Sequence, residues 1–206
     1  MKLSVSIFLF FLLVNFSFSQ ELQKVGADYE QLLNEIDNDT LVTRRTVRYE
    51  CSEDVFGEVH FFYKEDSLRL IKHIYKQAYY QEYTRERYYI KRDSLLLQSV
   101  FTEMINLNSN NYQNSHGSYV SGAEKFMEYT EERRFITNAE MDCYQRSFGN
   151  KVSEWDQDYF NTLGFRKSQC TGDFEEVTDK FKLLLKVERK ILNSYRKDPS
   201  CIFHIW

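Results

Sequence analysis

One segment of the chain is nearly repeated further along. Residues 83–100 read YTRERYYIKRDSLLLQSV, and residues 129–146 read YTEERRFITNAEMDCYQR. In each copy, side chains of two kinds alternate on either side of a short polar stretch, which is the pattern of a β-hairpin. Because successive hairpins pair with one another, a chain that repeats this unit is expected to form an antiparallel sheet.

A third copy of the hairpin signal precedes these two. The stretches FYKEDSL, YIKRDSL and FITNAEM, which start at Phe62, Tyr89 and Phe135, align without a gap. Each ends a strand with aromatic or apolar residues, turns through polar ones and begins the next strand with Leu or Met. The sequence therefore predicts an antiparallel β-meander of about six strands. Residues 106–122, rich in Asn, Ser, Gly and Tyr, are predicted to be an inserted polar loop.

Helical periodicity flanks this β region. Apolar residues recur every three or four positions over residues 21–36, which predicts an amphipathic N-terminal helix. Asp173 and Glu176 have capping-box spacing and are followed by a second apolar stripe, which predicts a C-terminal helix. A short helix is predicted from Trp155 to Leu163, ending at Gly164, because glycine is a common C-cap residue. The fold class is α+β, with the two amphipathic helices covering one face or edge of the sheet.

The N-terminus has the three-part pattern of a cleaved secretory signal. Lys2 is basic, residues 7–14 are apolar, and Ser17 and Ser19 are the small residues expected before a cleavage site. The apolar run is too short for a stable membrane span. We therefore expect residues 1–19 to be a signal peptide and residues 20–206 to be a single secreted or periplasmic domain, with no membrane span after cleavage.

Four cysteines in an exported chain favour disulfides and allow three pairings. They are Cys51, Cys143, Cys170 and Cys201. A helix between Cys170 and Cys201 would be roughly 33 Å long and would separate them. The sequence therefore favours Cys51 pairing with Cys170 or with Cys201, rather than a bridge between Cys170 and Cys201. Free buried thiols are the alternative.

Charged and aromatic residues alternate within the repeated strands and so are expected to share one face of the sheet. Such a face could bind an anionic or sugar-like ligand through arginine forks and aromatic platforms. The alternative is an exposed face of cross-strand ion pairs, to which Glu131 would contribute. The residues predicted to bind a ligand are Tyr83, Arg85, Arg87, Tyr89, Tyr129, Arg133 and Phe135.

No metal or cofactor site is predicted. His60 and His73 would lie opposite each other if the first hairpin turned between Asp66 and Ser67, but a shared metal needs a third ligand, so ordinary strand histidines are expected. Three acidic residues alternate around Trp155 without the glycine turn of a calcium loop, and we interpret them as a solvated face. These acidic residues are Glu154, Asp156 and Asp158.

Composition and motifs bear on the function. The net charge of −4 is spread along the chain without a basic block, so neither nucleic acid nor anionic membrane is expected as a partner. Glycine-rich phosphate loops and common catalytic motifs are missing from the sequence. The preferred interpretation is an exported, non-enzymatic binding or interaction module for an unknown protein or small molecule. The alternatives are a hydrolase with scattered catalytic residues, His116 or His73 being its base, and a lipid-carrying half-barrel.

Two short stretches carry a resemblance to known proteins. GEVHFFY at residues 57–63 and LRLIK at residues 68–72 resemble uncharacterised exported proteins of the Bacteroidota, in which such strand pairs are followed by further aromatic and Leu pairs. The resemblance covers residues 51–145. The hairpins are also distantly similar to MORN-like repeats, which carry glycine where this chain has Asp66 and Asp93. Neither resemblance implies catalytic residues.

Overall fold

The computed structural model describes residues 2–38, 42–52, 55–77, 82–107, 125–137 and 139–193. The predicted polar loop falls mostly in residues 108–124, and the C-terminal residues 194–206 also lie outside these ranges. One sheet of eight strands dominates the fold, and its spatial order follows the chain from β1 to β8. All neighbouring strands are antiparallel. The α+β class and the meander are therefore confirmed, with eight strands instead of about six.

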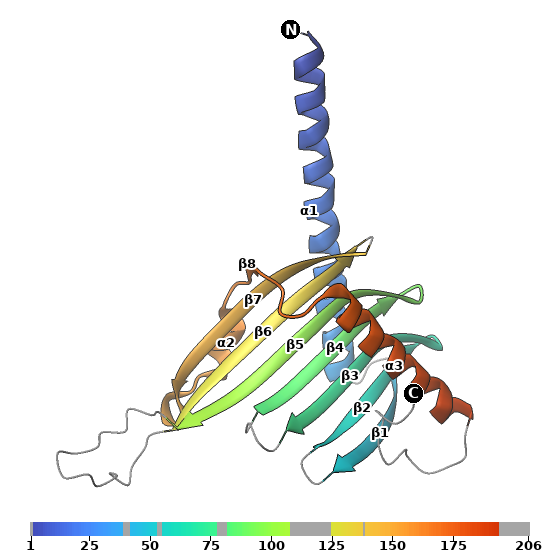
Figure 1. Ribbon diagram of the computed structural model, residues 1–206, viewed down its shortest axis with the longest axis vertical. Helices are drawn as coiled ribbons and strands as arrows, with labels where there is room; N and C mark the ends of the chain where they lie inside the picture. Colours follow the sequence, from blue (N-terminus) through green and yellow to red (C-terminus); the bar gives the residue numbers. More distant parts are fainter. Residues whose placement is uncertain are drawn as a thin grey trace, which may run out of the picture.

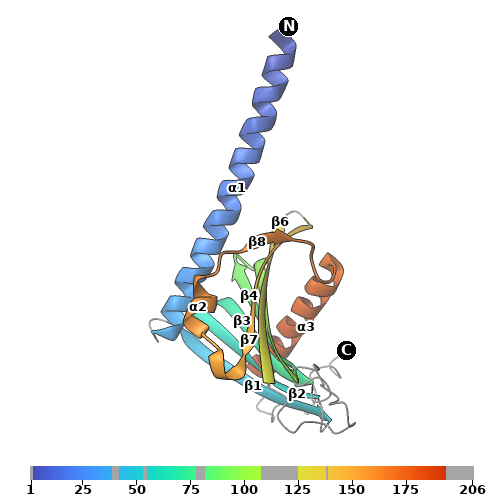
Figure 2. The same ribbon diagram turned by 90° about the vertical axis from the view of Figure 1, so that its left-hand side faces the viewer.

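The strands are β1 (Thr43–Ser52), β2 (Val55–Lys64), β3 (Ser67–Gln77), β4 (Glu82–Lys91), β5 (Ser94–Leu107), β6 (Lys125–Thr137), β7 (Glu140–Lys151) and β8 (Arg166–Ser168). The helices are α1 (Lys2–Asp37), the 3-10 helix η2 (Val152–Glu154), α2 (Gln157–Thr162) and α3 (Phe174–Asn193). Figure 1 shows α3 crossing the sheet, and Figure 2 shows α1 and α2 on the opposite face. The sheet is thus covered by helices on both faces.

The three predicted hairpins are the pairs β2–β3, β4–β5 and β6–β7. In the first two, both residues of the two-residue turn have positive φ: Glu65 (52°) and Asp66 (60°), then Arg92 (51°) and Asp93 (60°). This is the backbone of a type I′ turn, whose twist matches that of antiparallel strands. The equivalent positions in the repeated sequence therefore perform equivalent structural roles. The two additional strands, β1 and β8, are the edges of the sheet.

The core on the α3 side is formed by the apolar stripe of that helix. The backbone N–H of Glu176 donates to Asp173 Oδ1 at 2.7 Å, so Asp173 is the predicted N-terminal cap. Val177, Phe181 and Leu184 then pack on the sheet. Tyr88 stacks on Phe181, with 6.1 Å between the ring centroids.

The core on the α1 side uses the predicted N-terminal stripe. Leu22, Tyr29 and Leu32 are buried against residues of the five neighbouring strands from β2 to β6. The helix itself is longer than predicted, since it begins at Lys2, and its first half extends beyond the sheet (Figure 1). Among the helices within the described ranges, none is both long and apolar enough to cross a membrane.

The short helix after the sheet differs from the prediction at its C-terminal end. Asp156 caps α2 by accepting a hydrogen bond from the Tyr159 N–H at 2.9 Å. The helix ends at Thr162, and Leu163 is already extended. Gly164 is therefore not the C-cap, because the chain leaves the helix without the left-handed residue that favours glycine.

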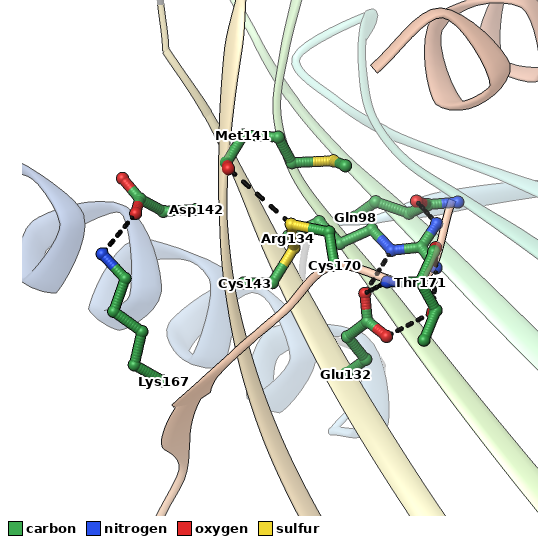
Figure 3. Close-up of a disulfide and its surroundings, with 9 residues drawn as sticks. All are labelled: Gln98, Glu132, Arg134, Met141, Asp142, Cys143, Lys167, Cys170 and Thr171. Atoms are coloured by element: carbon green, nitrogen blue, oxygen red, sulfur yellow. Dashed lines mark hydrogen bonds and ion pairs between the residues drawn. A yellow bond between two sulfur atoms is a disulfide. The ribbon is translucent and has the colours of Figure 1, made fainter. Parts of the chain in front are cut away.

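A disulfide joins Cys143 of β7 to Cys170, just before α3 (Figure 3). Of the two pairings that the sequence favoured for Cys51, the one with Cys170 is therefore wrong, and the one with Cys201 involves a residue outside the described ranges. The observed bridge depends on β8. Ser168 of this strand lies opposite Cys143, so Cys170, which follows two residues later, is brought beside β7. Cys51 is also disulfide-bonded, and Cys201 lies outside the described ranges.

Candidate functional site

The predicted ligand-binding residues lie on the sheet face that α1 and α2 cover. Arg85 is opposite Phe101 of β5, and Phe101 is in turn opposite Glu131 of β6. The next row of the same face contains Arg87, Ser99 and Arg133. The alternation in sequence thus places these charged residues together. Their surroundings differ from one residue to the next.

The aromatic members pack within the protein. Tyr89 and Phe135 are buried in the α1-side core, and their exposed fractions are 1% and 8%. Tyr129 packs against Trp155 with 3.9 Å between ring centroids, next to α2. The side chain of Tyr83 lies outside what the structure describes, although its backbone belongs to β4. Tyr89 and Phe135 therefore present no ring to a ligand from solution.

Arg133 belongs to an ion-pair network that holds the sheet and α1 together. Glu131 accepts from Arg133 Nε at 3.2 Å, from Arg146 Nη2 at 2.6 Å and from Ser99 Oγ at 3.0 Å. Arg133 also pairs with Glu30 of α1. Burial raises the pKa of Glu131, but the charges of Arg133 and Arg146 lower it below its ordinary value. The positive charge of Arg133 is thus already compensated.

Three other cations form a group that we call the cationic cluster: Lys72 of β3, with Arg85 and Arg87 of β4. Lys72 lies directly opposite Arg87, and Arg85 is two residues along β4 on the same face. Within the described ranges, none of the three forms an ion pair with a carboxylate. The Nε of Arg85 is buried and has no hydrogen-bond partner there.

Within the cationic cluster, the surroundings of Lys72 disfavour its positive charge. Burial lowers the pKa of Lys72, and the charges of Arg85 and Arg87 lower it further. Asp37 and Glu58 act in the opposite direction but do not restore the ordinary value. Burial lowers the pKa of Arg87, but Tyr29, Glu131 and Asp37 raise it above its ordinary value. Like charges on facing strands destabilise a sheet, so the unfavourable charge is that of Lys72, which a bound anion would stabilise.

Phe101 fixes the orientation of one cation in the cluster. The guanidinium carbon of Arg85 lies 5.1 Å from the centroid of the Phe101 ring, within the range of a cation–π contact. That ring is held in turn by Phe160 of α2, at 5.9 Å between centroids. Arg85 is therefore positioned by packing, while its Nε donor remains unused.

The sequence assigned Arg85 and Arg87 to a site but missed Lys72. Lys72 joins them through the register of β3 against β4, a pairing between two hairpins that the repeat alone does not specify. The sequence indicates only which face of β3 carries Lys72, through the alternation of side chains along the strand.

The histidines are not opposite each other, because the turn is not centred between Asp66 and Ser67. His60 faces Lys72, whereas His73 faces Val59, which places the two rings on opposite faces. The turn is centred one residue earlier than expected, and a register shift at Phe62 and Tyr63 recovers only half of the difference. Across the described residues, no group of three or more His, Cys, Asp or Glu side chains is arranged to hold a metal.

His73 belongs to a buried polar network on the α3 face, centred on Glu86. One Glu86 oxygen accepts from Lys180 Nζ at 2.6 Å and from the Tyr75 hydroxyl at 3.1 Å. The other accepts from the Tyr88 hydroxyl at 2.8 Å and lies 3.3 Å from His73 Nδ1. The second ring nitrogen of His73 lies 2.7 Å from the Tyr49 hydroxyl. We call these six residues the Glu86 network.

The protonation states follow from these contacts. Burial raises the pKa of Glu86, but the hydrogen bond from His73 and the charge of Lys180 lower it more strongly, to about 2. Burial lowers the pKa of His73 and raises that of Tyr49. Glu86 is therefore ionised, and His73 is neutral with both ring nitrogens occupied. The hydrolase base proposed at His73 is 1% exposed, and His116 lies outside the described ranges.

Glu86 makes stability dependent on acid pH. Its folded pKa of about 2 is below the ordinary value of 4.5, so its contribution is complete above pH 4.5 and is lost as the pH falls towards 2. We expect the urea midpoint of Glu86→Gln to vary less over this range than that of the wild type. The exposed variant Glu50→Gln is the control and should follow the wild type. Parallel wild-type and Glu86→Gln profiles would contradict the assignment.

Comparison of the chain with protein-family models, curated proteins and solved structures gave no match. The resemblance to exported hairpin-repeat proteins therefore stays a prediction.

Proposed function

We propose that the chain is an exported binding module that holds a small anionic ligand at the cationic cluster. The observation that carries the proposal is the buried Arg85 Nε, which has no partner in the described part of the chain. A buried donor without a partner costs free energy, because it has lost its hydrogen bonds to water. An acceptor oxygen supplied by a ligand would satisfy it.

The chemistry of the cluster favours an oxyanion. Two guanidinium groups can each donate to a pair of oxygens, and Lys72 adds a compact positive charge opposite Arg87. A phosphate, sulfate or carboxylate group meets these requirements. The ligand class is therefore an acidic small molecule, and the rest of it would contact the ring of Phe101, which is partly exposed.

Export is the other part of the proposal. The N-terminal pattern is that of a secretory signal. The disulfide between Cys143 and Cys170 is of the kind that persists in oxidising compartments. These features support a secreted or periplasmic location for the module.

Neutralising the cluster should weaken anion binding. We expect orthophosphate, sulfate or glucuronate to raise the melting temperature of the wild type, and Arg85→Gln or Arg87→Gln to reduce the affinity about 10-fold or more, since a hydrogen bond to a charged group contributes about 1.5–3 kcal/mol. Calorimetric titration of the full chain measures this affinity. Lys72→Gln should have a similar effect.

The matched control is Lys182→Gln. Lys182 lies on the exposed side of α3 and pairs with Asp179, so the variant has the same change in net charge at a distant place. It should bind the anion as the wild type does. Equal losses in Lys182→Gln and Arg85→Gln would show a non-specific charge effect and would refute the site.

A further inference from the structure

A cavity lies on the opposite face, between the sheet and α3. Its volume is about 250 Å³, and Val100 of β5 forms part of its wall together with residues of β3, β4, β6 and α3. Thr84, Gln98 and Thr102 contribute polar groups from two adjacent strands. This volume approaches that of small-ligand pockets. The cavity is separated from the cationic cluster by the sheet itself.

The two cations that line this cavity are already paired. Lys180 Nζ donates to Glu86 at 2.6 Å, and Arg134 Nε donates to Glu132 at 2.7 Å. Arg134 also donates through Nη1 to the Gln98 oxygen at 3.0 Å. Each cation therefore has its carboxylate, and Glu176 adds a further carboxylate to the wall, so the cavity offers hydrogen bonds without an unpaired cation among these two.

Donors remain after these bonds are counted. An ammonium group has three N–H donors and a guanidinium five. Lys180 uses one for Glu86 and a second for the Tyr75 hydroxyl at 3.4 Å. Gln98 accepts from Arg134 through its oxygen, and its amide group interacts with the Tyr88 hydroxyl. Hydroxyls of Thr84 and Thr102, which both donate and accept, complete the set.

We infer that this cavity is a second binding site, for a neutral polyhydroxyl ligand of monosaccharide size. A hydroxyl group both donates and accepts, so it matches the mixture of threonine, amide and paired charged groups. The C–H face of a sugar ring would meet Val100. A purely apolar ligand would leave the polar wall groups without partners, at a cost in free energy.

Covalent and polar contacts fix the segment that precedes α3. These contacts hold the helix in place and so keep the cavity preformed. Figure 3 shows the disulfide between Cys143 and Cys170 beside the bonds from Arg134 to Gln98 and to Thr171. Thr171 N–H also donates to Glu132 at 3.1 Å. Since Arg134 both lines the cavity and holds the segment before α3, the helix and the wall are positioned together.

The test uses the full chain and a panel of glucose, galactose, mannose and N-acetylglucosamine. Saturation-transfer NMR and calorimetry should detect at least one of them with a millimolar dissociation constant. Val100→Phe, which fills the cavity, should weaken that binding at least 10-fold. Thr102→Val, which removes a hydroxyl without changing the shape, should weaken it several-fold and decides the matter if Val100→Phe does not fold.

Arg85→Gln is the control, because it changes the opposite face. It should leave sugar binding unchanged, while Val100→Phe should leave anion binding unchanged. The inference is overturned if no sugar of the panel binds the wild type, or if a sugar binds equally well to Thr102→Val and to a folded Val100→Phe. Sugar binding that depends on Arg85 instead would move the ligand to the cationic cluster. Failure of the sugar site and failure of the anion site are thus separate outcomes.

Discussion

Replacing Glu86 by alanine should lower the free energy of unfolding by about 3–5 kcal/mol, because it removes one partner of a buried ion pair and leaves the other uncompensated. Lys180 would lose its carboxylate, and the hydroxyls of Tyr75 and Tyr88 would lose their acceptor. Glu86 itself is only 5% exposed, so water cannot easily replace these contacts. Urea denaturation followed by circular dichroism measures the effect.

The control for this variant is Glu50→Ala, which removes an exposed carboxylate of β1 and should change stability by less than about 0.5 kcal/mol. Replacing both partners, with Glu86→Gln and Lys180→Met together, should recover part of the loss, since contacting residues couple by about 0.5–3 kcal/mol. A Glu86→Ala loss no larger than that of Glu50→Ala would mean that the network contributes little to stability.

Removing the disulfide should have an effect of similar size. Cys143 and Cys170 are 27 residues apart, and the chain-entropy estimate for such a loop is about 3–4 kcal/mol. The double variant Cys143→Ser with Cys170→Ser should therefore unfold at a clearly lower urea concentration than the wild type under oxidising conditions. The loss includes freedom gained by the segment that joins β8 to α3.

Reduction of the wild type provides the comparison, because it also breaks the disulfide of Cys51. Reduced wild-type protein should be at most as stable as the oxidised double variant. A double variant within 1 kcal/mol of the oxidised wild type would show that β8 and the contacts of Thr171 hold this segment without the covalent bond.

Much of the fold was predictable because the same local sequence pattern for a hairpin recurs along the chain. The turn positions of the hairpins recur in the sequence, and positive φ at Asp66 and Asp93 shows that the repeated residues occupy the same conformation. The capping-box spacing at Asp173 likewise identified the start of α3, and hydrogen bonding confirms it. Local signals of this kind depend on neighbouring residues only, so they can be read without the tertiary structure.

The errors concern register and long-range contacts. A turn displaced by one residue and a register shift at Tyr63 moved His73 to the other face from His60. The edge strand β8 has only three residues, too few for a periodic signal, yet it determines the partner of Cys143. Such pairings depend on residues that are far apart in sequence.

The candidate site was predicted in part. Arg85 and Arg87 were identified from their alternation, whereas Lys72 required the pairing of β3 with β4. Arg133 shares the predicted face but is engaged by Glu131 and by Glu30 of α1. Which arginines retain unused donors depends on side-chain partners, and the strand pattern does not contain that information.

The most direct test of anion binding at the cationic cluster observes the unused Nε–H donor of Arg85. An NMR titration of the isotope-labelled chain with orthophosphate can follow the arginine Nε–H resonances, with Arg85→Gln identifying the signal of Arg85. We expect that signal to shift with the saturation curve measured by calorimetry, as the anion supplies the missing acceptor. An Arg85 signal that stays unchanged at saturating phosphate would contradict anion binding at the cationic cluster.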